Sequence, residues 1–424
     1  MKIEALHQLF LDSKSVCTDT RKIKKGDLFF ALKGDNFNGN SYAEQALQKG
    51  AKYAIIDEKE CHTSNATILV DDVLKTLQEL ASFHRDHLKT PIIALTGSNG
   101  KTTTKELINA ILSQKFNTTA TVGNLNNHIG VPLTLLSMTA ATEIGIVEMG
   151  ANHQKEIEFL CTIAKPDYGL ITNFGKAHLE GFGGVKGVVK GKSEIYTHLI
   201  HNNKTIFVNA DDPIQVEKTL NANKFTFGKS NTKPNVSIDF LEAQPFVKCS
   251  FNRLTIESKL IGDYNFNNIA VAIAIGNYFK IDATKIKFAI ENYIPSNNRS
   301  QIINRDSNKI ILDAYNANPT SMRAALLNFE KQEGHKIAIL GDMFELGEEA
   351  EDEHQTITDL AISLDIDKII FVGENFYKTE LSSEKASQFK TFEDFKNEFD
   401  LSKIENATLL IKGSRGMALE RIMN

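Results

Sequence analysis

The chain has 424 residues, of which 42% are hydrophobic and 24% charged, with a formal net charge of −5. The length favours about two to four domains, and the small negative charge gives no electrostatic reason to expect a nucleic-acid partner. The four cysteines are scattered without a CxxC pair, which argues against a zinc site or a disulfide framework. The N-terminus lacks a signal-peptide layout, and no run approaches the roughly 18 apolar residues of a membrane helix. We therefore expect a cytoplasmic protein with no membrane-inserted segment.

Short apolar runs that end at Gly, Asn or Asp recur along the chain and predict strands buried on both faces of a parallel sheet. They lie at 92–96, 145–149, 170–173, 206–209, 310–313, 337–340 and 409–411. Many of them lead into helical patterns, so the predicted fold class is α/β. In such sheets ligands bind beyond the carboxyl ends of the strands, where these polar residues gather.

Breaks in this pattern predict three domains. A helix expected at 76–89 is followed by Thr90 and Pro91, which restart a strand, so the first domain is placed at 1–88. The run 295–299 follows an expected helix and indicates a linker, which places the second domain at 89–295 and the third at 296–424. Between about 225 and 260 apolar residues alternate with polar ones, which predicts antiparallel strands inside the second domain; they are Val236, Ile238, Phe240, Leu254 and Ile256.

The strongest local signal is the run TGSNGKTTT at 96–104, between an expected strand and an expected amphipathic helix. Glycines let backbone N–H groups close on phosphate oxygens, and the N-terminus of the helix adds a favourable dipole. Lys101 would reach the terminal phosphates and the Thr102 hydroxyl would bind Mg²⁺. The general P-loop pattern needs Gly where this chain has Leu95, so the spacing is the shorter GxxGKT. The run predicts a nucleoside triphosphate site and leaves the reaction open, with a glycine-rich turn that binds no nucleotide as the alternative.

This loop is similar to the TG(T/S)xGKTT(T) loop of the Mur ligases, and further segments resemble the same family in the same order. They are GNLNNHIGVP at 123–132, EMGA at 148–151, ITNFGKAHLE at 171–180, KSEIY at 192–196, NADD at 209–212 and GDYNFNN at 262–268. The family often has His where this chain has Tyr264. The runs DAYNANP at 313–319, ILGDMFELG at 339–347 and KGSRGM at 412–417 look like the branch that adds D-alanyl-D-alanine, whereas related ligases tend to read DYAHxP at the first of them.

The resemblance covers nearly the whole chain and implies the three-domain Mur ligase architecture. The N-terminal domain would bind the UDP-substrate, the central P-loop domain would bind ATP, and the Rossmann-like C-terminal domain would bind the amine. The implied reaction is the ATP-dependent joining of D-alanyl-D-alanine to UDP-N-acetylmuramoyl-tripeptide through an acyl phosphate, in peptidoglycan synthesis. The implied cofactors are ATP and Mg²⁺ at two sites, and we expect a monomer.

The resemblance also assigns catalytic roles to Lys101, Glu148, His178 and Lys192. Thr102 would hold one Mg²⁺, and Glu148 and His178 would hold a second. Lys192 matches a lysine that the family often carbamylates, and the carbamate would support the second metal. Without the resemblance, His178 reads as an ordinary loop residue, Lys192 as a surface lysine, and Glu148 equally well as a buried, paired carboxylate.

Binding roles follow in the same way. The nucleotide would contact Gly97, Ser98, Asn99, Gly100, Lys101, Thr102 and Thr103 of the loop, together with Asn268, Arg299 and Asp313. The dipeptide and the growing peptide would contact Asn316, Asn318, Ser414 and Arg415, and the asparagine segment adds Asn124, Asn126 and Asn127 as substrate contacts.

The first domain resembles the family segment that holds the UDP end. It contributes Thr20, Arg21 and Asn36 as expected substrate contacts. The planar fork of Arg21 suits a diphosphate, although a structural ion pair is an equally good reading of a lone Arg.

Three ligands on three domains imply hinges, and we expect the free protein to be open about residues near 88 and 295. Two rival interpretations remain at this point. Another amide ligase of the superfamily, either the one that forms the tripeptide or a folylpolyglutamate synthase, is the nearer rival; the tripeptide-forming branch is expected to carry an acidic-substrate Arg motif where this chain has 315–318. A non-catalytic P-loop protein is the other, and it would not need Glu148, His178 and Lys192 at three separate strand ends.

Overall fold

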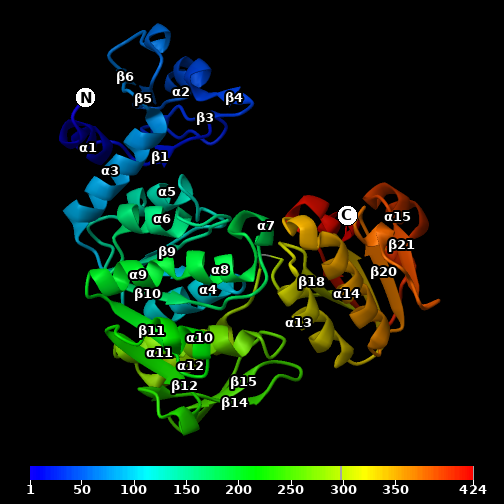
Figure 1. The fold of residues 1–424 in the computed structure, drawn as a ribbon. Coiled ribbons are helices and arrows are strands. Elements are labelled where there is room, and N and C mark those ends of the chain that lie inside the picture. Colours follow the sequence, from blue (N-terminus) through cyan, green and yellow to red (C-terminus); the bar gives the residue numbers. More distant parts are fainter. Residues whose placement is uncertain (297, 424) are drawn as a thin grey trace.

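The computed structural model describes residues 1–296 and 298–423. Three main sheets of four, seven and six strands follow one another along the described chain, and we call each of them with its helices the N-terminal, middle and C-terminal unit (Figure 1). Each sheet falls inside one of the three domains predicted from the sequence, while the boundaries themselves stay predictions. Asn297, within the linker predicted at 295–299, lies outside the described residues. Among the described residues no helix has the length and apolar character that crossing a bilayer requires.

The N-terminal unit is built on a parallel sheet with the order β1-β2-β5-β6. Its strands are β1 (Val16–Cys17), β2 (Leu28–Phe30), β5 (Tyr53–Ile56) and β6 (Thr67–Leu69), with the small hairpin β3 (Lys33–Gly34) and β4 (Phe37–Asn38). Its helices are α1 (Ile3–Leu11), α2 (Ala43–Gln48) and α3 (Val73–Leu88). The predicted helix at 76–89 is confirmed as α3, which begins earlier because the Asp72 side chain caps it by accepting from the Lys75 N–H at 2.8 Å.

The middle unit holds a seven-stranded parallel sheet with the order β13-β12-β11-β10-β7-β9-β8. The strands are β7 (Ile92–Thr96), β8 (Thr118–Ala120), β9 (Ile144–Glu148), β10 (Tyr168–Ile171), β11 (Thr205–Asn209), β12 (Lys224–Gly228) and β13 (Val236–Ser237). Alternate residues of β7 enter different cores: Ile92 and Ala94 pack in one, Ile93 and Leu95 in the other. The sheet is therefore covered by helices on both faces, as its unbroken apolar strands predict.

The helices of the middle unit form the two covering layers. Their bounds are α4 (Lys101–Leu112), α5 (Gly130–Leu136), α6 (Glu156–Ala164), α7 (Leu179–Phe182), α8 (Val185–Lys192), α9 (Glu194–His201), α10 (Pro213–Lys218), α11 (Asn265–Tyr278) and α12 (Ala283–Asn292). The strands β9 and β10 pair with β7 on its two opposite edges. This is a topological switch point, where the carboxyl ends of the strands form a crevice for ligands.

A small antiparallel sheet extends the middle unit. It consists of β14 (Asp239–Glu242), β15 (Lys248–Phe251) and β16 (Leu254–Glu257). The antiparallel prediction for 225–260 is confirmed for Phe240, Leu254 and Ile256, but it is wrong for Val236, which lies in β13 and pairs in parallel with β12. Alternation of apolar residues reports one buried face and does not reveal the direction of the neighbouring strand.

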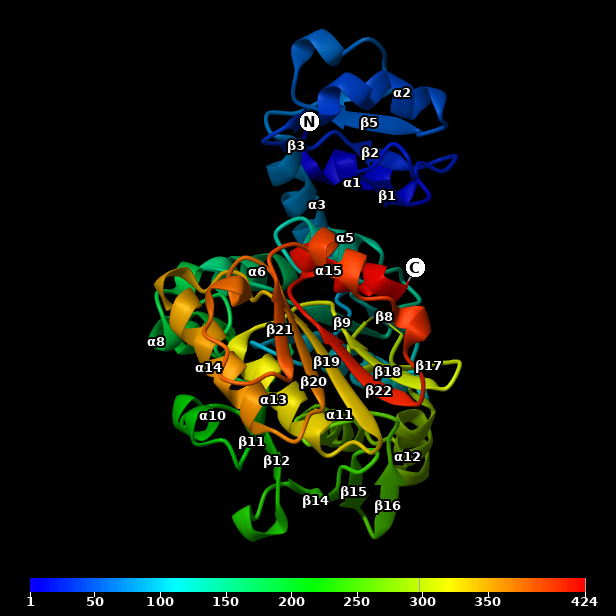
Figure 2. The ribbon, with the colours of Figure 1, turned by 90° about the vertical axis from the view of Figure 1, so that its right-hand side faces the viewer.

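The C-terminal unit has a six-stranded sheet with the order β17-β18-β22-β19-β20-β21, in which only β17 runs antiparallel to its neighbour (Figure 2). The strands are β17 (Gln301–Arg305), β18 (Asn308–Asp313), β19 (His335–Gly341), β20 (Lys368–Val372), β21 (Ala386–Phe389) and β22 (Ala407–Lys412). The helices are α13 (Pro319–Glu330), α14 (Ala350–Ser363) and α15 (Phe392–Glu398). The last strand enters the sheet between β18 and β19, so residues near 313, 342 and 413 meet at one edge.

Helix α3 connects the N-terminal unit to the middle unit and buries polar groups between them (Figure 1). Arg85 donates to the carbonyl oxygens of Ala164 and Lys165 at 3.1 Å each and pairs with Asp167 at 2.7 Å. His84 Nε2 lies 2.9 Å from the Met138 carbonyl oxygen, and its Nδ1 lies 3.0 Å from Nε2 of His7 in α1. A neutral imidazole ring has one N–H donor and one acceptor nitrogen. These contacts are consistent with neutral rings, because His84 can then donate from Nε2 to the Met138 carbonyl oxygen and accept at Nδ1 from His7.

Acidification should loosen this junction. Burial, His84 and His87 lower the pKa of His7 to about 4, and burial lowers that of His84. Between the unfolded value near 6.5 and the folded value, the unfolded chain binds more protons, so stability falls as the pH drops through this window. The midpoint temperature of thermal unfolding should fall more steeply between pH 7 and pH 4.5 for wild type than for His7→Gln. The exposed His201→Gln is the control and should behave like wild type. Equal pH slopes for wild type and His7→Gln would contradict the prediction.

Candidate active site

A pocket of about 800 Å³ lies where the carboxyl ends of the middle strands face the C-terminal sheet. Most residues predicted for the site line it, although they come from distant parts of the chain. These are Ser98, Asn99, Gly100, Lys101, Thr103, Asn124, Asn126, Asn127, Glu148, His178, Asn268, Arg299, Asp313, Asn316, Asn318, Ser414 and Arg415. The lining does not include Gly97, Thr102 and Lys192 of the middle unit. It also does not include Thr20, Arg21 and Asn36, which belong to the N-terminal unit.

The phosphate loop joins β7 to α4 and requires glycine at two points. Gly97 has φ 144°, and a Cβ there would lie 2.0 Å from Thr172 Oγ1. Gly100 has φ 77°, and a Cβ there would lie 2.4 Å from Asn268 Oδ1. The loop is also held from β10, because the Thr172 hydroxyl donates to the Asn99 carbonyl oxygen at 2.6 Å. The backbone is therefore set in place before any ligand binds.

Lys101 lies folded against its own loop. Its Nζ donates to the carbonyl oxygen of Gly97 at 2.6 Å and to that of Ser98 at 3.3 Å. Burial lowers the pKa of Lys101 to about 8, although the nearby Glu148 carboxylate acts in the opposite direction. An ammonium whose hydrogen-bond partners among the described residues are backbone carbonyl oxygens gains strongly from an anion, which is what a terminal phosphate supplies.

Glu148 ends β9 and is buried beside the loop. Its Oε2 accepts from the Thr102 hydroxyl at 2.9 Å, and its Oε1 accepts from Asn126 Nδ2 at 2.8 Å. The strand end is fixed as well, because the Glu148 N–H donates to Thr121 Oγ1 at 3.0 Å. A hydroxyl and a carboxylate side by side at a phosphate loop are the oxygen donors that Mg²⁺ prefers.

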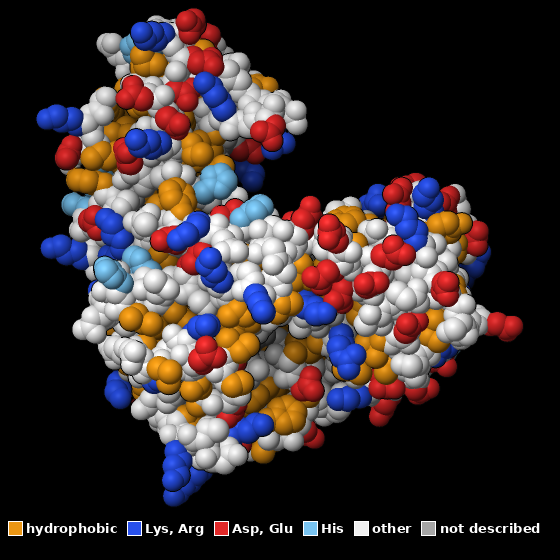
Figure 3. Space-filling view, in the orientation of Figure 1, with side chains coloured by type: hydrophobic (Ala, Val, Ile, Leu, Met, Phe, Trp, Pro, Cys, Tyr) orange, Lys and Arg blue, Asp and Glu red, His pale blue; other side chains and the backbone are white. Residues whose placement is uncertain are grey.

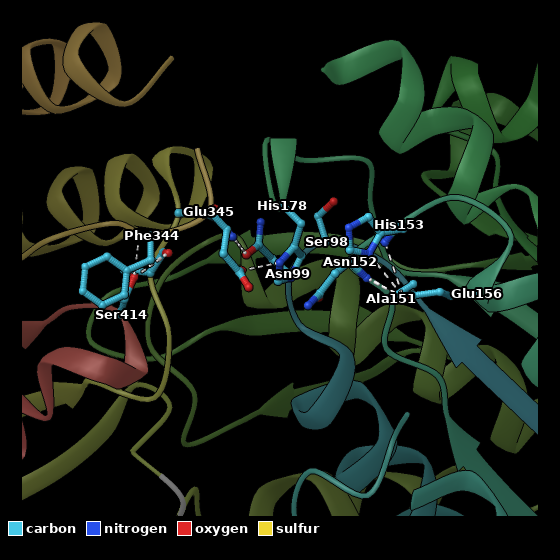
Figure 4. Close-up of polar contacts among 12 residues, drawn as sticks. Ser98, Asn99, Ala151, Asn152, His153, Glu156, His178, Phe344, Glu345 and Ser414 are labelled. Atoms are coloured by element: carbon cyan, nitrogen blue, oxygen red, sulfur yellow. Dashed lines mark hydrogen bonds and ion pairs between the residues drawn. The ribbon is translucent and has the colours of Figure 1, made fainter. Parts of the chain in front are cut away.

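His178 precedes α7 and faces the C-terminal unit. Its Nδ1 lies 2.5 Å from Glu345 Oε2 (Figure 4), and this pairing holds the pKa of Glu345 below its usual range. Both residues have left-handed backbones, with φ 53° and 63°. Such backbones cost of order 1 kcal/mol or more each and gather at functional sites.

Lys192, at the end of α8, is fully buried. Its Nζ donates to the Ala151 carbonyl oxygen at 3.0 Å and lies 4.8 Å from the centroid of the Phe182 ring. Burial and the nearby charge of Lys101 hold its pKa well below the usual lysine value. The surface-lysine alternative is therefore wrong. Within residues 1–296 and 298–423, no group of three or more His, Cys, Asp and Glu side chains is arranged to hold a metal ion, so the second Mg²⁺ site stays a prediction.

At the other end of the pocket, an arginine stacks on an aromatic ring and a carboxylate is held by hydrogen bonds. The Arg299 guanidinium carbon lies 3.7 Å from the centroid of the Tyr315 ring. Asp313 accepts from the Ser300 N–H at 3.0 Å and from Lys412 Nζ at 2.5 Å. An aromatic ring, an arginine and an oriented carboxylate suit a nucleoside, whose base stacks and whose ribose donates hydroxyl protons.

Among the residues that the structure describes, three buried nitrogen atoms of the pocket have no hydrogen-bond partner. They are Asn99 Nδ2, His178 Nδ1 and Arg299 Nε. The orientation of the Asn99 amide is set, because its Oδ1 accepts from Asn318 Nδ2 at 2.7 Å. Buried donors are costly to leave unpaired, so the Asn99 amide and the Arg299 guanidinium fit an anionic ligand that accepts from both. Asn268 also lines the pocket; its Oδ1 accepts from the Thr104 hydroxyl at 3.1 Å and its Nδ2 donates to Asn265 Oδ1 at 2.8 Å, while its contact with the nucleotide stays a prediction.

Contacts bridge the middle and C-terminal units around the pocket. Lys176 pairs with Glu353, and its N–H donates to Thr320 Oγ1 at 2.9 Å. Asn318 caps α13 by accepting from the Ser321 N–H at 2.9 Å while it also binds Asn99. Within the C-terminal unit, Ser414 Oγ accepts from the Phe344 N–H at 2.9 Å. Figure 3 shows an open notch between the N-terminal and C-terminal units.

The residues predicted in the N-terminal unit lie outside the pocket. Arg21 forms a bidentate pair with Asp19, at 2.9 Å from Nε and 2.8 Å from Nη2. Asn36 is exposed in the turn between β3 and β4, and the Thr20 carbonyl oxygen accepts from Lys49 Nζ at 3.0 Å. Their roles in substrate binding stay predictions.

The residues that line the pocket without having been predicted include Tyr315, Phe344, Glu345 and Lys412. The signal for these was present, because they stand at or just past strand ends within the runs 313–319, 339–347 and 412–417. What the sequence alone lacked was the strand order that brings those three ends together.

Comparison with known proteins decides the family. The model described as Mur ligase middle domain matches residues 95–276, the Mur ligase, glutamate ligase domain matches 298–415, and the Mur ligase family, catalytic domain matches 13–85. The chain belongs to the Mur ligase family. Taken along the chain, the three models cover the main sheets of the N-terminal, middle and C-terminal units.

Individual relatives are similar over almost their full length. The UDP-N-acetylmuramoyl-tripeptide--D-alanyl-D-alanine ligase of Bacillus subtilis (strain 168) is 34% identical over 96% of this chain and 92% of that protein. The enzyme of the same name from Escherichia coli (strain K12) is also 34% identical, over 96% and 92%.

Solved structures agree in fold. A crystal structure of MurF from Acinetobacter baumannii superposes with a TM-score of 0.87 at 30% identity, covering 100% of this chain and 97% of that chain. MurF ligase from Thermotoga maritima in complex with ADP has a TM-score of 0.83 at 26% identity, with the same coverage. The predicted fold class, α/β with three-domain Mur ligase architecture, is confirmed.

Proposed function

We infer that the chain catalyses the ATP-dependent joining of D-alanyl-D-alanine to UDP-N-acetylmuramoyl-tripeptide, a step of peptidoglycan synthesis. The observation that carries this function is the single pocket in which the phosphate loop, Glu148 and His178 of the middle unit face Asn316, Ser414 and Arg415 of the C-terminal unit. The same chain-long similarity to ligases named for this reaction supports it. A non-catalytic P-loop protein would need no such second wall.

The residues support a two-step reaction. In the first step, a carboxylate of the tripeptide attacks the terminal phosphate of ATP, ADP leaves and an acyl phosphate forms, so two anions must approach each other. Lys101, released from the Gly97 and Ser98 carbonyl oxygens, neutralises that charge, and Arg299 and Asp313 hold the nucleoside end. In the second step the dipeptide amine attacks the activated carbon and phosphate leaves. Such chemistry depends on positioning and charge neutralisation.

Mg²⁺, when bound, would supply further positive charge to offset the repulsion between the phosphate and the carboxylate. Thr102 and Glu148, whose oxygens lie 2.9 Å apart, fit one ion. His178 and a carbamylated Lys192 would serve a second ion together with Glu148. We propose two magnesium sites, a cytoplasmic location and a monomer as the working state.

The test is phosphate release from ATP by the purified protein with UDP-N-acetylmuramoyl-tripeptide, with and without D-alanyl-D-alanine. We expect release to need both, and the product to be heavier by one dipeptide less water. Release that ignores the dipeptide would keep the acyl-phosphate step and refute the amine assignment. No release under any pairing of substrates would refute ligase function.

Ligand binding should also close the notch between the units. The UDP end and the amine are assigned to units that lie on opposite sides of it (Figure 3), and the acyl phosphate must be kept from water. Small-angle scattering should therefore give a smaller radius of gyration with an ATP analogue plus UDP-tripeptide than without ligands. Superimposable profiles would argue against hinges near 88 and 295.

A further inference from the structure

The segment that carries Arg299 opens the C-terminal unit and has an unusual backbone. Arg299 lies between Asn298 and Ser300, which have left-handed φ values of 56° and 51°. Such backbones are rare in residues other than glycine and persist where the surroundings hold them. The guanidinium stacks on Tyr315, while its Nε has no hydrogen-bond partner among the residues that the structure describes. The segment therefore presents a buried donor to the pocket.

The C-terminal unit holds the backbone of this segment. The Asn298 N–H donates to Gln301 Oε1 at 3.3 Å, and the Asn298 carbonyl oxygen accepts from the Tyr315 N–H at 3.2 Å. The Ser300 N–H donates to Asp313 Oδ1 at 3.0 Å. These contacts fix the segment to the C-terminal sheet and leave its distance from the phosphate loop to contacts with the middle unit.

Tyr264 supplies such a contact. It stands directly before α11, which Figure 1 shows inside the middle unit, and its hydroxyl lies 2.9 Å from Ser300 Oγ, with either hydroxyl able to donate. The ring lies over Gly262, where a Cβ would be 2.2 Å from the ring carbon Cε1. Ser300 is buried, and burial raises the pKa of Tyr264, so the phenol keeps its proton. The contact is therefore a neutral hydrogen bond between the two units.

The helix behind Tyr264 is tied to the helix of the phosphate loop. Asn268 of α11 accepts from the Thr104 hydroxyl of α4 at 3.1 Å. Burial lowers the pKa of Lys101, and the charge of Arg299 adds to this effect. The two cations therefore lie near enough to act on the same anion. Through α11, Tyr264 connects the segment of Arg299 to the element that carries Lys101.

We propose that Tyr264 is a positioning residue for Arg299: through Ser300, it holds the guanidinium at the distance from the phosphate loop that a bound nucleotide requires. Tyr264 acts through the segment and does not itself bind the nucleotide, although its side chain lines the same pocket. Docking of the C-terminal unit on the middle unit thereby completes the nucleotide site. This inference rests on the proposed function for the nucleotide role of Arg299.

The first test is a double-mutant cycle on nucleotide binding. Calorimetry measures the affinity of the analogue AMP-PNP, with Mg²⁺, for wild type, Tyr264→Phe, Ser300→Ala and the double variant. Each single change should weaken binding about 3- to 10-fold, the effect of one neutral hydrogen bond. The double variant should bind no more weakly than either single variant. Tyr196→Phe is the matched control and should bind like wild type, because its buried hydroxyl contacts Gln215 at 3.4 Å inside the middle unit.

A second cycle combines Tyr264→Phe with Arg299→Ala. Because Tyr264 acts through Arg299, its replacement should have no further effect when the guanidinium is absent. Additive losses in this cycle would overturn the proposal, as would wild-type affinity in Tyr264→Phe. Wild-type affinity in Ser300→Ala beside weakened binding in Tyr264→Phe would also overturn it, because the phenol would then contact the nucleotide itself. Equal weakening in Tyr196→Phe would reduce the effect to a general loosening of the unit and would refute positioning.

Steady-state ligation separates positioning from stability. Tyr264→Phe should raise the KM for ATP by a factor similar to the loss of affinity, with kcat and the KM for D-alanyl-D-alanine little changed. A lower kcat with an unchanged KM for ATP would contradict the proposal. If wild type binds AMP-PNP but ligates nothing, the proposed function fails while the two cycles still decide the role of Tyr264. Wild type that binds no AMP-PNP would overturn both.

Discussion

Replacing Lys101 with alanine should lower kcat/KM for ATP by about 10³-fold or more, since one lost charge contact at a reacting phosphate has effects of this order. Among the residues that the structure describes, the hydrogen-bond partners of the ammonium are the carbonyl oxygens of Gly97 and Ser98, and burial lowers its pKa to about 8. Its charge is therefore held in place for a ligand at the expense of stability. Phosphate release at saturating tripeptide and dipeptide measures the loss.

The same variant should unfold at an equal or higher temperature than wild type. The folded pKa of Lys101 lies below the unfolded value near 10.4. Between those values the unfolded chain binds more protons, so the stability of wild type relative to Lys101→Ala should rise as the pH is raised from 8 to 10. A variant that is inactive and markedly less stable would mean that the lysine supports the fold, and the catalytic interpretation would not stand.

The phosphate loop was predictable because its geometry is local. A strand, two glycines and a helix start lie within nine residues, and the structure needs those glycines for close approach to Thr172 and Asn268. The apolar strands were predictable for a related reason, since residues buried on both faces leave no room for polar side chains. Local pattern and global fold agree at these places.

Contacts that depend on strand order or on the docking of units were beyond the sequence. Lys412 meets Asp313 because β22 lies beside β18 in the C-terminal sheet, and Glu345 meets His178 because the loop after β19 faces the middle unit. Sequence order does not give strand order. The direction of β13 was missed for a similar reason, because alternation marks a buried face of a strand without naming its partner.

The burial of Lys192 lies between these two cases. Val188 stands one helical turn before it and is also buried, and Gly187 and Gly191 allow α8 to pack closely against Phe182. The helical spacing of Val188 and Lys192 already placed the lysine on the inner face. The nearby exposed Lys186 and Lys190 outweighed that signal in the sequence interpretation.

Lys192→Ala should reduce ligation about 10²- to 10³-fold, a loss of the size expected when a catalytic group at the transferring phosphate is removed. The exposed Lys190→Ala, on the same helix, should keep wild-type activity. The physical reason is that burial and the charge of Lys101 hold the pKa of Lys192 well below its usual value, which favours the uncharged amine more than at an ordinary lysine. A neutral amine is the form that reacts with CO₂: its nitrogen bonds to the carbon, one proton is released, and a carbamate anion results.

Carbamylation would change the sign of the charge beside Lys101 from repulsive to attractive and would supply oxygen ligands that a bare lysine lacks. Protein equilibrated with ¹³C-bicarbonate should therefore give a carbamate ¹³C signal that is present in Lys190→Ala and absent in Lys192→Ala. Removal of CO₂ should lower activity, and bicarbonate should restore it. Full activity with no carbamate signal would leave Lys192 as a buried structural amine, and the second magnesium site would then have to be built without it.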